Sequence, residues 1–114
     1  MKIDKFEDIL AWQKAKCLTV EIYQEIKGIN DHSFKDQLQR ASVSIMNNIA
    51  EGFERKSNKE FKYFLFVAKG SCAEVRSMLH LASELKIIQS DKSDQLLLKS
   101  IEISKMLSGF IKKL

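Results

Sequence analysis

The sequence contains no proline among its 114 residues, and glycine occurs only four times. Proline and glycine are the residues that most often end helices and strands or build turns. Apolar residues instead recur every three or four positions over four long stretches, which is the spacing of one face of an α-helix. Alternating runs of β-branched residues, which would indicate strands, are sparse. The sequence therefore predicts an all-α protein whose long helices are joined by short connections.

Residues near the ends of these stretches fix the expected helices. Gly28 is suited to end the first helix in a left-handed conformation, and Ser33 is suited to cap the start of the second. Ser57 and Glu60 have the spacing of a capping box at the start of the third. Gly70 lies inside that helix, where glycine costs about 1 kcal/mol relative to alanine, and we interpret it as a point of close helix–helix approach. The predicted helices span about residues 8–27, 33–55, 57–85 and 90–112.

Short connections place consecutive helices side by side in opposite directions. We therefore expect residues 1–114 to form one domain, an antiparallel up-down-up-down four-helix bundle. Phe34, Met46 and Phe66 lie off the main apolar stripes, and extra apolar positions of this kind indicate a subunit interface. A wide core that absorbs them is the alternative.

Motifs for catalysis or metal binding are missing from the sequence. Cys72 and His80 are eight residues apart, about 12 Å along a helix, which is too far for a nucleophile and its base. The two histidines and two cysteines have no metal-ligand spacing, and no phosphate-binding glycine loop is present. We expect a protein that is not an enzyme and uses no metal and no cofactor.

The compartment is inferred from cysteine use and hydropathy. Cys17 and Cys72 are interpreted as small buried side chains in a reducing environment. No apolar run approaches the length of about 20 residues that a membrane span needs. We expect a soluble, cytoplasmic protein without a membrane partner.

Polar residues on the second and third helices form one group of interest. If these helices form a hairpin centred near residue 56, Arg40 falls opposite Glu74, and we predict an ion pair between them. Asn48 and Glu51 border the apolar stripe. We expect a structural role for all four, in fixing helix register or contacting a neighbouring subunit, rather than ligand binding. The alternative is that they lie on a solvated edge.

A basic stripe on the third helix forms the other group. Lys62, Lys69 and Arg76 are seven residues apart, and Lys59 lies one turn before Lys62. Cations at this spacing can follow a phosphate backbone, and the interleaved Phe66 could stack on a base. The formal net charge of +4 arises in residues 57–114, which hold ten basic and six acidic side chains. A solvated helix surface has the same pattern and is the alternative reading.

Three segments together resemble a known family. Residues 6–15 read F-E-D-I-L-A-W-Q-K-A, similar to F-x-D-L-x-x-W-Q-x-A. Residues 37–52 read Q-L-Q-R-A-S-V-S-I-M-N-N-I-A-E-G, similar to Q-x-x-R-A-x-x-S-I-x-x-N-I-A-E-G. Residues 64–74 read F-L-F-V-A-K-G-S-C-A-E, similar to F-L-x-x-A-x-G-S-x-x-E. The chain thus resembles the bacterial four-helix-bundle family of rRNA intervening-sequence proteins, which is related to the accessory variability determinant of diversity-generating retroelements.

The resemblance implies several properties that the residues alone do not give. It implies a four-helix bundle that assembles as a homopentamer, with no established enzymatic activity. The retroelement relatives imply binding of RNA or DNA and, by analogy, a reverse transcriptase as a partner. Met46 stands where the family often has a proline, so a kink at that position is not expected here.

Two main functions follow from these observations. The leading hypothesis is a homo-oligomer that binds RNA or DNA electrostatically through Lys59, Lys62, Lys69 and Arg76. The alternative is a structural or protein-interaction scaffold that binds no nucleic acid. A protein that binds a small molecule in the bundle core is a third and more distant hypothesis. Salt dependence separates the first two, because phosphate binding weakens steeply as salt rises.

Overall fold

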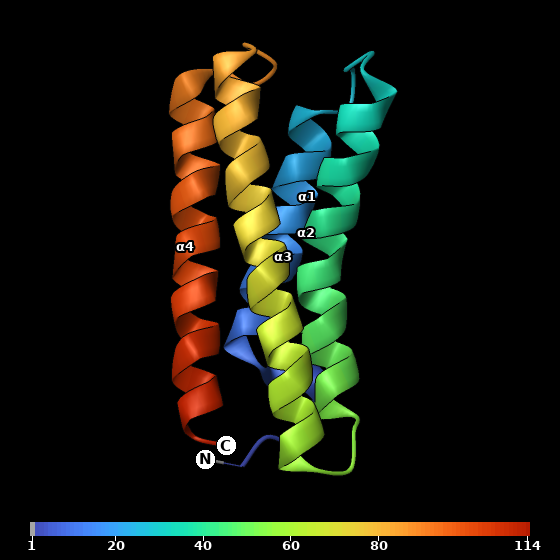
Figure 1. Ribbon diagram of the computed structural model, residues 1–114, viewed down its shortest axis with the longest axis vertical. Helices are drawn as coiled ribbons and strands as arrows, with labels where there is room; N and C mark the ends of the chain where they lie inside the picture. Colours follow the sequence, from blue (N-terminus) through green and yellow to red (C-terminus); the bar gives the residue numbers. More distant parts are fainter. Residues whose placement is uncertain (1) are drawn as a thin grey trace.

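A computed structural model describes residues 2–114, which form four α-helices and no strand (Figure 1). The helices are α1 (Leu10–Glu25), α2 (His32–Phe53), α3 (Asn58–Glu84) and α4 (Ser90–Lys112), preceded by a short 3-10 helix, η1 (Phe6–Asp8). The predicted all-α class with four helices is confirmed. Each predicted helix end lies within two residues of the observed one, because the apolar spacing that indicated the helices is the spacing that buries them.

The helices pack side by side into a bundle with extents of 42 × 22 × 19 Å. Successive helices run back and forth along the long axis, and η1 lies toward the end of the bundle where α4 finishes (Figure 1). Within residues 2–114, α1 packs on α2 and α4, and α3 packs on α2 and α4, while the backbones of the diagonal pairs stay more than 8 Å apart and meet only through core side chains. The bundle therefore has four seams between neighbouring helices.

The predicted apolar stripes fill the core. One row of apolar side chains from each helix points inward, and the four rows together form a single core between the helices. The fully buried large residues are Ile9, Leu18, Ile22, Ile26, Leu38, Ile45, Ile49, Leu65, Leu79, Ile88, Leu96 and Ile103.

Some apolar residues do not have the roles expected for them. Phe34 is only 6% exposed and belongs to the core of the single chain, and Met46 is half-buried against the same core. Phe66 alone of the three off-stripe residues is largely exposed, at 56%. The prediction that Cys17 is buried was wrong. Cys17 follows the buried Ala15 by two residues, which carries it to the opposite side of α1.

Helix starts agree with the sequence at one position and differ at another. Ser57 accepts a hydrogen bond from the Glu60 backbone N–H at 3.2 Å, so the predicted Ser57 cap is confirmed. The Glu60 carboxylate accepts from the Ser57 hydroxyl at 3.1 Å rather than from the backbone N–H that completes a capping box. The cap of α2 is Asp31 rather than Ser33. Its carboxylate accepts from the Phe34 N–H at 3.0 Å, which starts the helix earlier than predicted.

The left-handed helix end also lies at another residue. No glycine in residues 2–114 has a positive φ, so the prediction for Gly28 was wrong. Lys86 instead has φ of 60° after α3. The Ile87 N–H donates to the Ala82 carbonyl at 2.8 Å and the Lys86 N–H donates to the Ser83 carbonyl at 3.1 Å, which is a Schellman motif.

Close approach of α2 and α3 occurs at a different glycine from the one predicted. A Cβ on Gly70 would meet nothing within 4 Å, and Gly70 is exposed. A Cβ on Gly52 would lie 2.6 Å from the Phe64 Cβ and 3.0 Å from the Phe61 ring. Gly52 is therefore the residue that lets the two helices come together near their connecting loop.

Candidate nucleic-acid interface

The α1–α4 seam is closed by ion pairs. Glu21 accepts from Lys99 at 2.5 Å and from Lys92 at 3.3 Å, and Lys14 lies 3.5 Å from Glu102. The Lys99 hydrogen bond lowers the pKa of Glu21, partial burial opposes that change, and Lys92 adds to the lowering. Both cations from α4 thus share one carboxylate from α1, and each cation of these ion pairs lies beside a counter-charge.

The predicted basic stripe lies along the α3–α4 side. Lys62 and Lys69 are half-buried, whereas Lys59 and Arg76 are exposed. Lys69 Nζ donates to Ser108 Oγ on α4 at 2.6 Å, which places Lys69 in the seam itself. Among residues 2–114, no carboxylate lies within 4.0 Å of any of the four cations.

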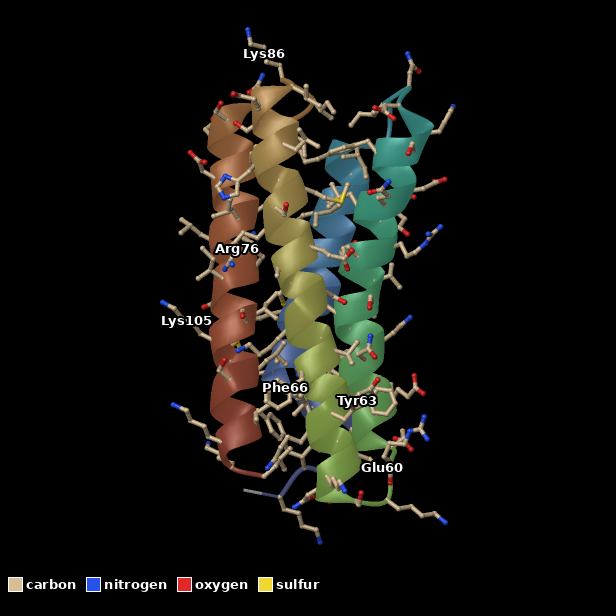
Figure 2. The ribbon with its side chains drawn as sticks, in the orientation of Figure 1. Glu60, Tyr63, Phe66, Arg76, Lys86 and Lys105 are labelled. Atoms are coloured by element: carbon tan, nitrogen blue, oxygen red, sulfur yellow. The ribbon has the colours of Figure 1, made fainter. Side chains whose placement is uncertain are left out.

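The four cations are not equally placed. Lys62 and Arg76 are one heptad from Lys69 on each side and so follow the same edge of α3. Figure 2 shows Arg76 extending from α3 toward α4, and Lys105 extending from α4 away from the bundle. Lys59 lies in the first turn of α3, close to the loop. The structure thus brings Lys62, Lys69 and Arg76 to one seam, with Lys59 at its end.

An aromatic side chain lies within this basic row. Phe66 is one turn from both Lys62 and Lys69 and remains 56% exposed. Figure 2 shows it on the α4 side of α3, whereas Tyr63 lies on the α2 side. An exposed ring flanked by cations offers a face on which a nucleobase can stack while the cations contact phosphates.

Sequence reasoning did not identify Ser108. Its hydroxyl accepts the hydrogen bond from Lys69 and so holds the ammonium between α3 and α4. The sequence carries no signal for this contact, because it depends on how far α4 is shifted along α3. Ser108 is 39 residues away from Lys69 in the chain.

The α2–α3 seam is joined by a chain of hydrogen bonds. Asn48 Nδ2 donates to the Ser44 carbonyl at 2.8 Å and to Ser44 Oγ at 2.9 Å. Ser71 Oγ, on α3, donates to the same Ser44 Oγ at 2.8 Å. Asn48 therefore acts through Ser44 on the register of α2 against α3, which is a structural role.

The ion pair predicted between Arg40 and Glu74 is wrong for a single chain. Both side chains are exposed, and neither takes part in an ion pair within 4.0 Å in residues 2–114. The hairpin arithmetic gave their level along the bundle but not their direction around each helix. Glu51 pairs within its own segment, accepting from Arg55 Nη2 at 2.7 Å, rather than with the third helix.

The described residues provide little basis for acid–base or metal-assisted catalysis. Burial raises the pKa of the Cys72 thiol to about 12, and the nearby Arg76 and Lys69 only partly offset this. A thiol with that pKa is protonated at neutral pH and is a poor nucleophile. In residues 2–114 no three His, Cys, Asp or Glu side chains are grouped so that they could hold a metal ion. No helix of this region is both long enough and apolar enough to cross a membrane.

Comparison with known proteins gives two matches. The sequence profile of the family described as 23S rRNA-intervening sequence protein matches residues 7–109. Among solved structures, the chain is similar to a protein with unknown function from the S23 ribosomal protein family of Bacteroides thetaiotaomicron VPI-5482. That likeness has a TM-score of 0.83 and 25% sequence identity, and it covers 90% of this chain and 99% of the other. A search of curated proteins gave no match.

Proposed function

The chain belongs to the 23S rRNA-intervening sequence protein family, and we propose that it is a non-enzymatic homo-oligomer that binds RNA or DNA electrostatically. The family resemblance favours a pentamer, and the proposal needs no cofactor. It places the protein in the cytoplasm, where RNA and DNA are both within reach. The proposed binding surface is the α3–α4 face, formed by Lys59, Lys62, Lys69 and Arg76.

One observation supports this surface above the others. Each cation in the ion pairs of the α1–α4 seam lies beside a carboxylate, whereas the α3–α4 seam holds cations that have none. Lys69 is half-buried there, and only a neutral hydroxyl contacts its ammonium. A partly desolvated cation without a counter-charge is stabilised when an anion approaches. Phosphate groups supply that charge.

The spacing of the cations suits a repeating anion. Residues seven apart on a helix are about 10 Å apart along its axis. Lysines and an arginine in such a row contact phosphates and do not read bases, so we expect binding that is nearly independent of sequence. Repetition of the row in an assembly would strengthen binding to long nucleic acid through multivalency.

Titration of labelled single-stranded and duplex RNA tests the surface. The Lys62→Glu/Lys69→Glu variant should bind at least tenfold more weakly than wild type and should show a salt slope smaller by about 2, since roughly one counterion is released per phosphate contact. A matched control is Lys5→Glu/Lys27→Glu, which makes the same change of charge at two exposed lysines outside α3 and α4. Equal weakening by both variants would mean that net charge, and not this surface, controls binding.

A structural or protein-interaction scaffold is the second candidate. Exposed apolar side chains on α3 favour it, because surfaces of this kind mark protein contacts. They are Tyr63, Phe66, Val67 and Leu81, with Leu85 at the C-cap of the helix. A reverse transcriptase, the partner implied by the retroelement relatives, would fit this candidate. Wild-type protein that binds no RNA or DNA at low salt would favour the scaffold over the nucleic-acid hypothesis.

Mass in solution tests the assembly. Light scattering or sedimentation across a range of concentrations should give about five chains per particle if the pentamer is correct. A stable monomer at micromolar concentration would rule out the homo-oligomer, and RNA titration of that monomer would still test the α3–α4 surface separately.

A further inference from the structure

We propose that the outward side of α3 packs on the outward side of α2 in a second copy of this chain, and that Arg40 of one copy pairs with Glu74 of the next. The inference rests on the self-association in the proposed function, and it adds the surfaces that meet. It starts from two features that a single chain leaves without a role, an uncharged stretch of α2 and an open glycine on α3.

The middle of α2 carries no charge on any side. Residues 41–50 contain no Asp, Glu, Lys or Arg, although they make nearly three turns of a surface helix. Ile45 and Ile49 point into the core, so Val43, Asn47 and Ala50 lie on the far side. A helix that is apolar all round is normally buried all round, and this stretch, although it includes two Ser and two Asn, has no charged side of the kind that normally faces water. In the single chain Asn47 is exposed and Val43 and Ala50 are half-buried.

The outward side of α3 is apolar and has a gap in its middle. Tyr63, Val67 and Leu81 are among the exposed large hydrophobic residues, and Gly70 lies between them. Nothing lies within 4 Å of a Cβ placed on Gly70. Glycine inside a helix costs about 1 kcal/mol relative to alanine, and no contact within the chain requires it here. A neighbouring helix that packs closely at Gly70 would make use of the missing side chain.

Large residues on one surface lie opposite small residues on the other, at the same position along the bundle axis. Ser44 lies level with Ser71, as their hydrogen bond shows, and this sets the level of every residue on α2 against α3. Cyclic symmetry about an axis parallel to the bundle moves a copy sideways without shifting it along the bundle. The open Gly70 then meets the region of Val43 on the next copy, and the large Tyr63 meets the region of the small Ala50.

Charge matches at the same levels. Arg40 lies one turn before Ser44 on α2, and Glu74 lies about one turn after Ser71 on α3, so the two are level. Both are exposed, opposite in sign and without an ion pair in residues 2–114. A copy placed with its α2 against α3 brings its Arg40 beside Glu74. The pair that the single chain does not form is thus completed between copies.

The two surfaces that meet in this contact are different from each other, and this determines the symmetry of the assembly. The contact joins two different surfaces, so each copy offers one to each of two neighbours, and the chain of contacts closes as a ring rather than a two-fold dimer. Lys62, Lys69 and Arg76 lie toward α4, away from this contact. Assembly through α2 and α3 therefore leaves these three cations uncovered, whereas Lys59 and Phe66, each one turn from Tyr63, border the contact.

Two variants that each damage one surface test the proposal by mass measurement. Val43→Glu alters the α2 surface and Gly70→Glu alters the α3 surface. Neither position is buried, and circular dichroism checks that both variants keep the wild-type helical content. Each variant alone should be monomeric at concentrations where wild type is a ring. An equimolar mixture should form a heterodimer, because only one intact pair of surfaces remains.

Charge exchange tests the ion pair within the same assay. Arg40→Glu and Glu74→Arg should each raise the dissociation constant of the assembly roughly tenfold or more, because like charges then meet. The double exchange should recover most of that loss.

The failures are distinguishable. A folded Val43→Glu or Gly70→Glu protein with wild-type mass, a mixture that stays monomeric, or a double exchange no better than the single variants would overturn this interface while wild-type assembly stands. Monomeric wild type would instead remove the homo-oligomer of the proposed function itself.

Discussion

Replacing Gly52 by alanine should destabilise the bundle, although alanine is the better helix former. Gly52 is buried near the end of α2, where α3 begins its return. A Cβ there would lie 2.6 Å from the Phe64 Cβ, 3.0 Å from the Phe61 ring and 3.3 Å from the Phe61 carbonyl oxygen. Carbon atoms pack best at about 3.5–4.0 Å, so α2 and α3 must separate by roughly 1 Å at this point.

The size of the effect follows from two opposing terms. Overpacking of a core typically costs about 1–3 kcal/mol, and the upper part of that range applies because the Phe64 Cβ cannot rotate away. Alanine in place of glycine returns about 1 kcal/mol through helix propensity. The net loss of unfolding free energy should be about 2 kcal/mol, which lowers the melting temperature by roughly 10 °C in a domain of this size.

A matched substitution separates the two terms. Gly109 lies in α4, and a Cβ on it would meet nothing within 4 Å. Gly109→Ala should therefore raise the unfolding free energy, by up to about 1 kcal/mol. Urea unfolding followed by circular dichroism, at one protein concentration for all three proteins, measures both changes. Gly52→Ala as stable as Gly109→Ala would refute the close approach of α2 and α3 at this residue.

The remaining predictions concern a strained residue, two thiols and an ion pair. Lys86→Gly should raise the unfolding free energy by about 1 kcal/mol, because a left-handed φ of 60° is unfavourable for any residue with a Cβ; no change on thermal unfolding would argue against strain there. Cys17 should react with a thiol reagent in the native protein and Cys72 only after unfolding, since Cys72 is buried and has a pKa raised to about 12; equal native rates would contradict this. The folded pKa of Glu21 is lowered, so its stabilising effect is present above the unfolded pKa and lost as pH falls through the folded value. In urea unfolding, Glu21→Gln should thus be less stable than wild type at pH 7, and the difference should shrink as pH falls through the folded pKa of Glu21; a difference that does not change with pH would mean that the ion pairs contribute little.

Helix positions and the inward rows could be predicted because both depend on one repeating local pattern. Leu65, Val75 and Leu79 were expected in the core and are fully buried. The Ser57 cap of α3 was predictable for the same reason, since its hydrogen bonds to Glu60 join residues three apart. Features of this kind need no knowledge of how one helix is shifted against another.

The sequence did not reliably predict features that depend on which way a side chain points around its helix. Arg40 and Glu74 were placed at the right level, but both project outward from the seam and stay apart. Gly52 and Gly70 look alike in the sequence, and only the packed helices show which one faces a neighbour. The Lys69–Ser108 contact likewise depends on the register of α3 against α4, which no local signal sets.

The exposed part of α3 carries two proposed surfaces, one for nucleic acid and one for assembly. Substitutions of adjacent residues should separate the two. Residues one apart on a helix differ by about 100° in direction. Lys62 therefore lies on the α4 side while Tyr63 lies on the α2 side, as Figure 2 shows for Tyr63. Lys62→Glu should weaken RNA binding and leave the mass of the assembly unchanged. Tyr63→Ser, which removes the ring without adding a charge beside the basic row, should lower the mass and leave the affinity for an oligonucleotide too short to span two copies unchanged. Titration and light scattering on the same two preparations measure both quantities. If either substitution changed mass and short-oligonucleotide affinity together, the two surfaces on α3 would be one surface, and assembly and nucleic-acid binding would compete for it.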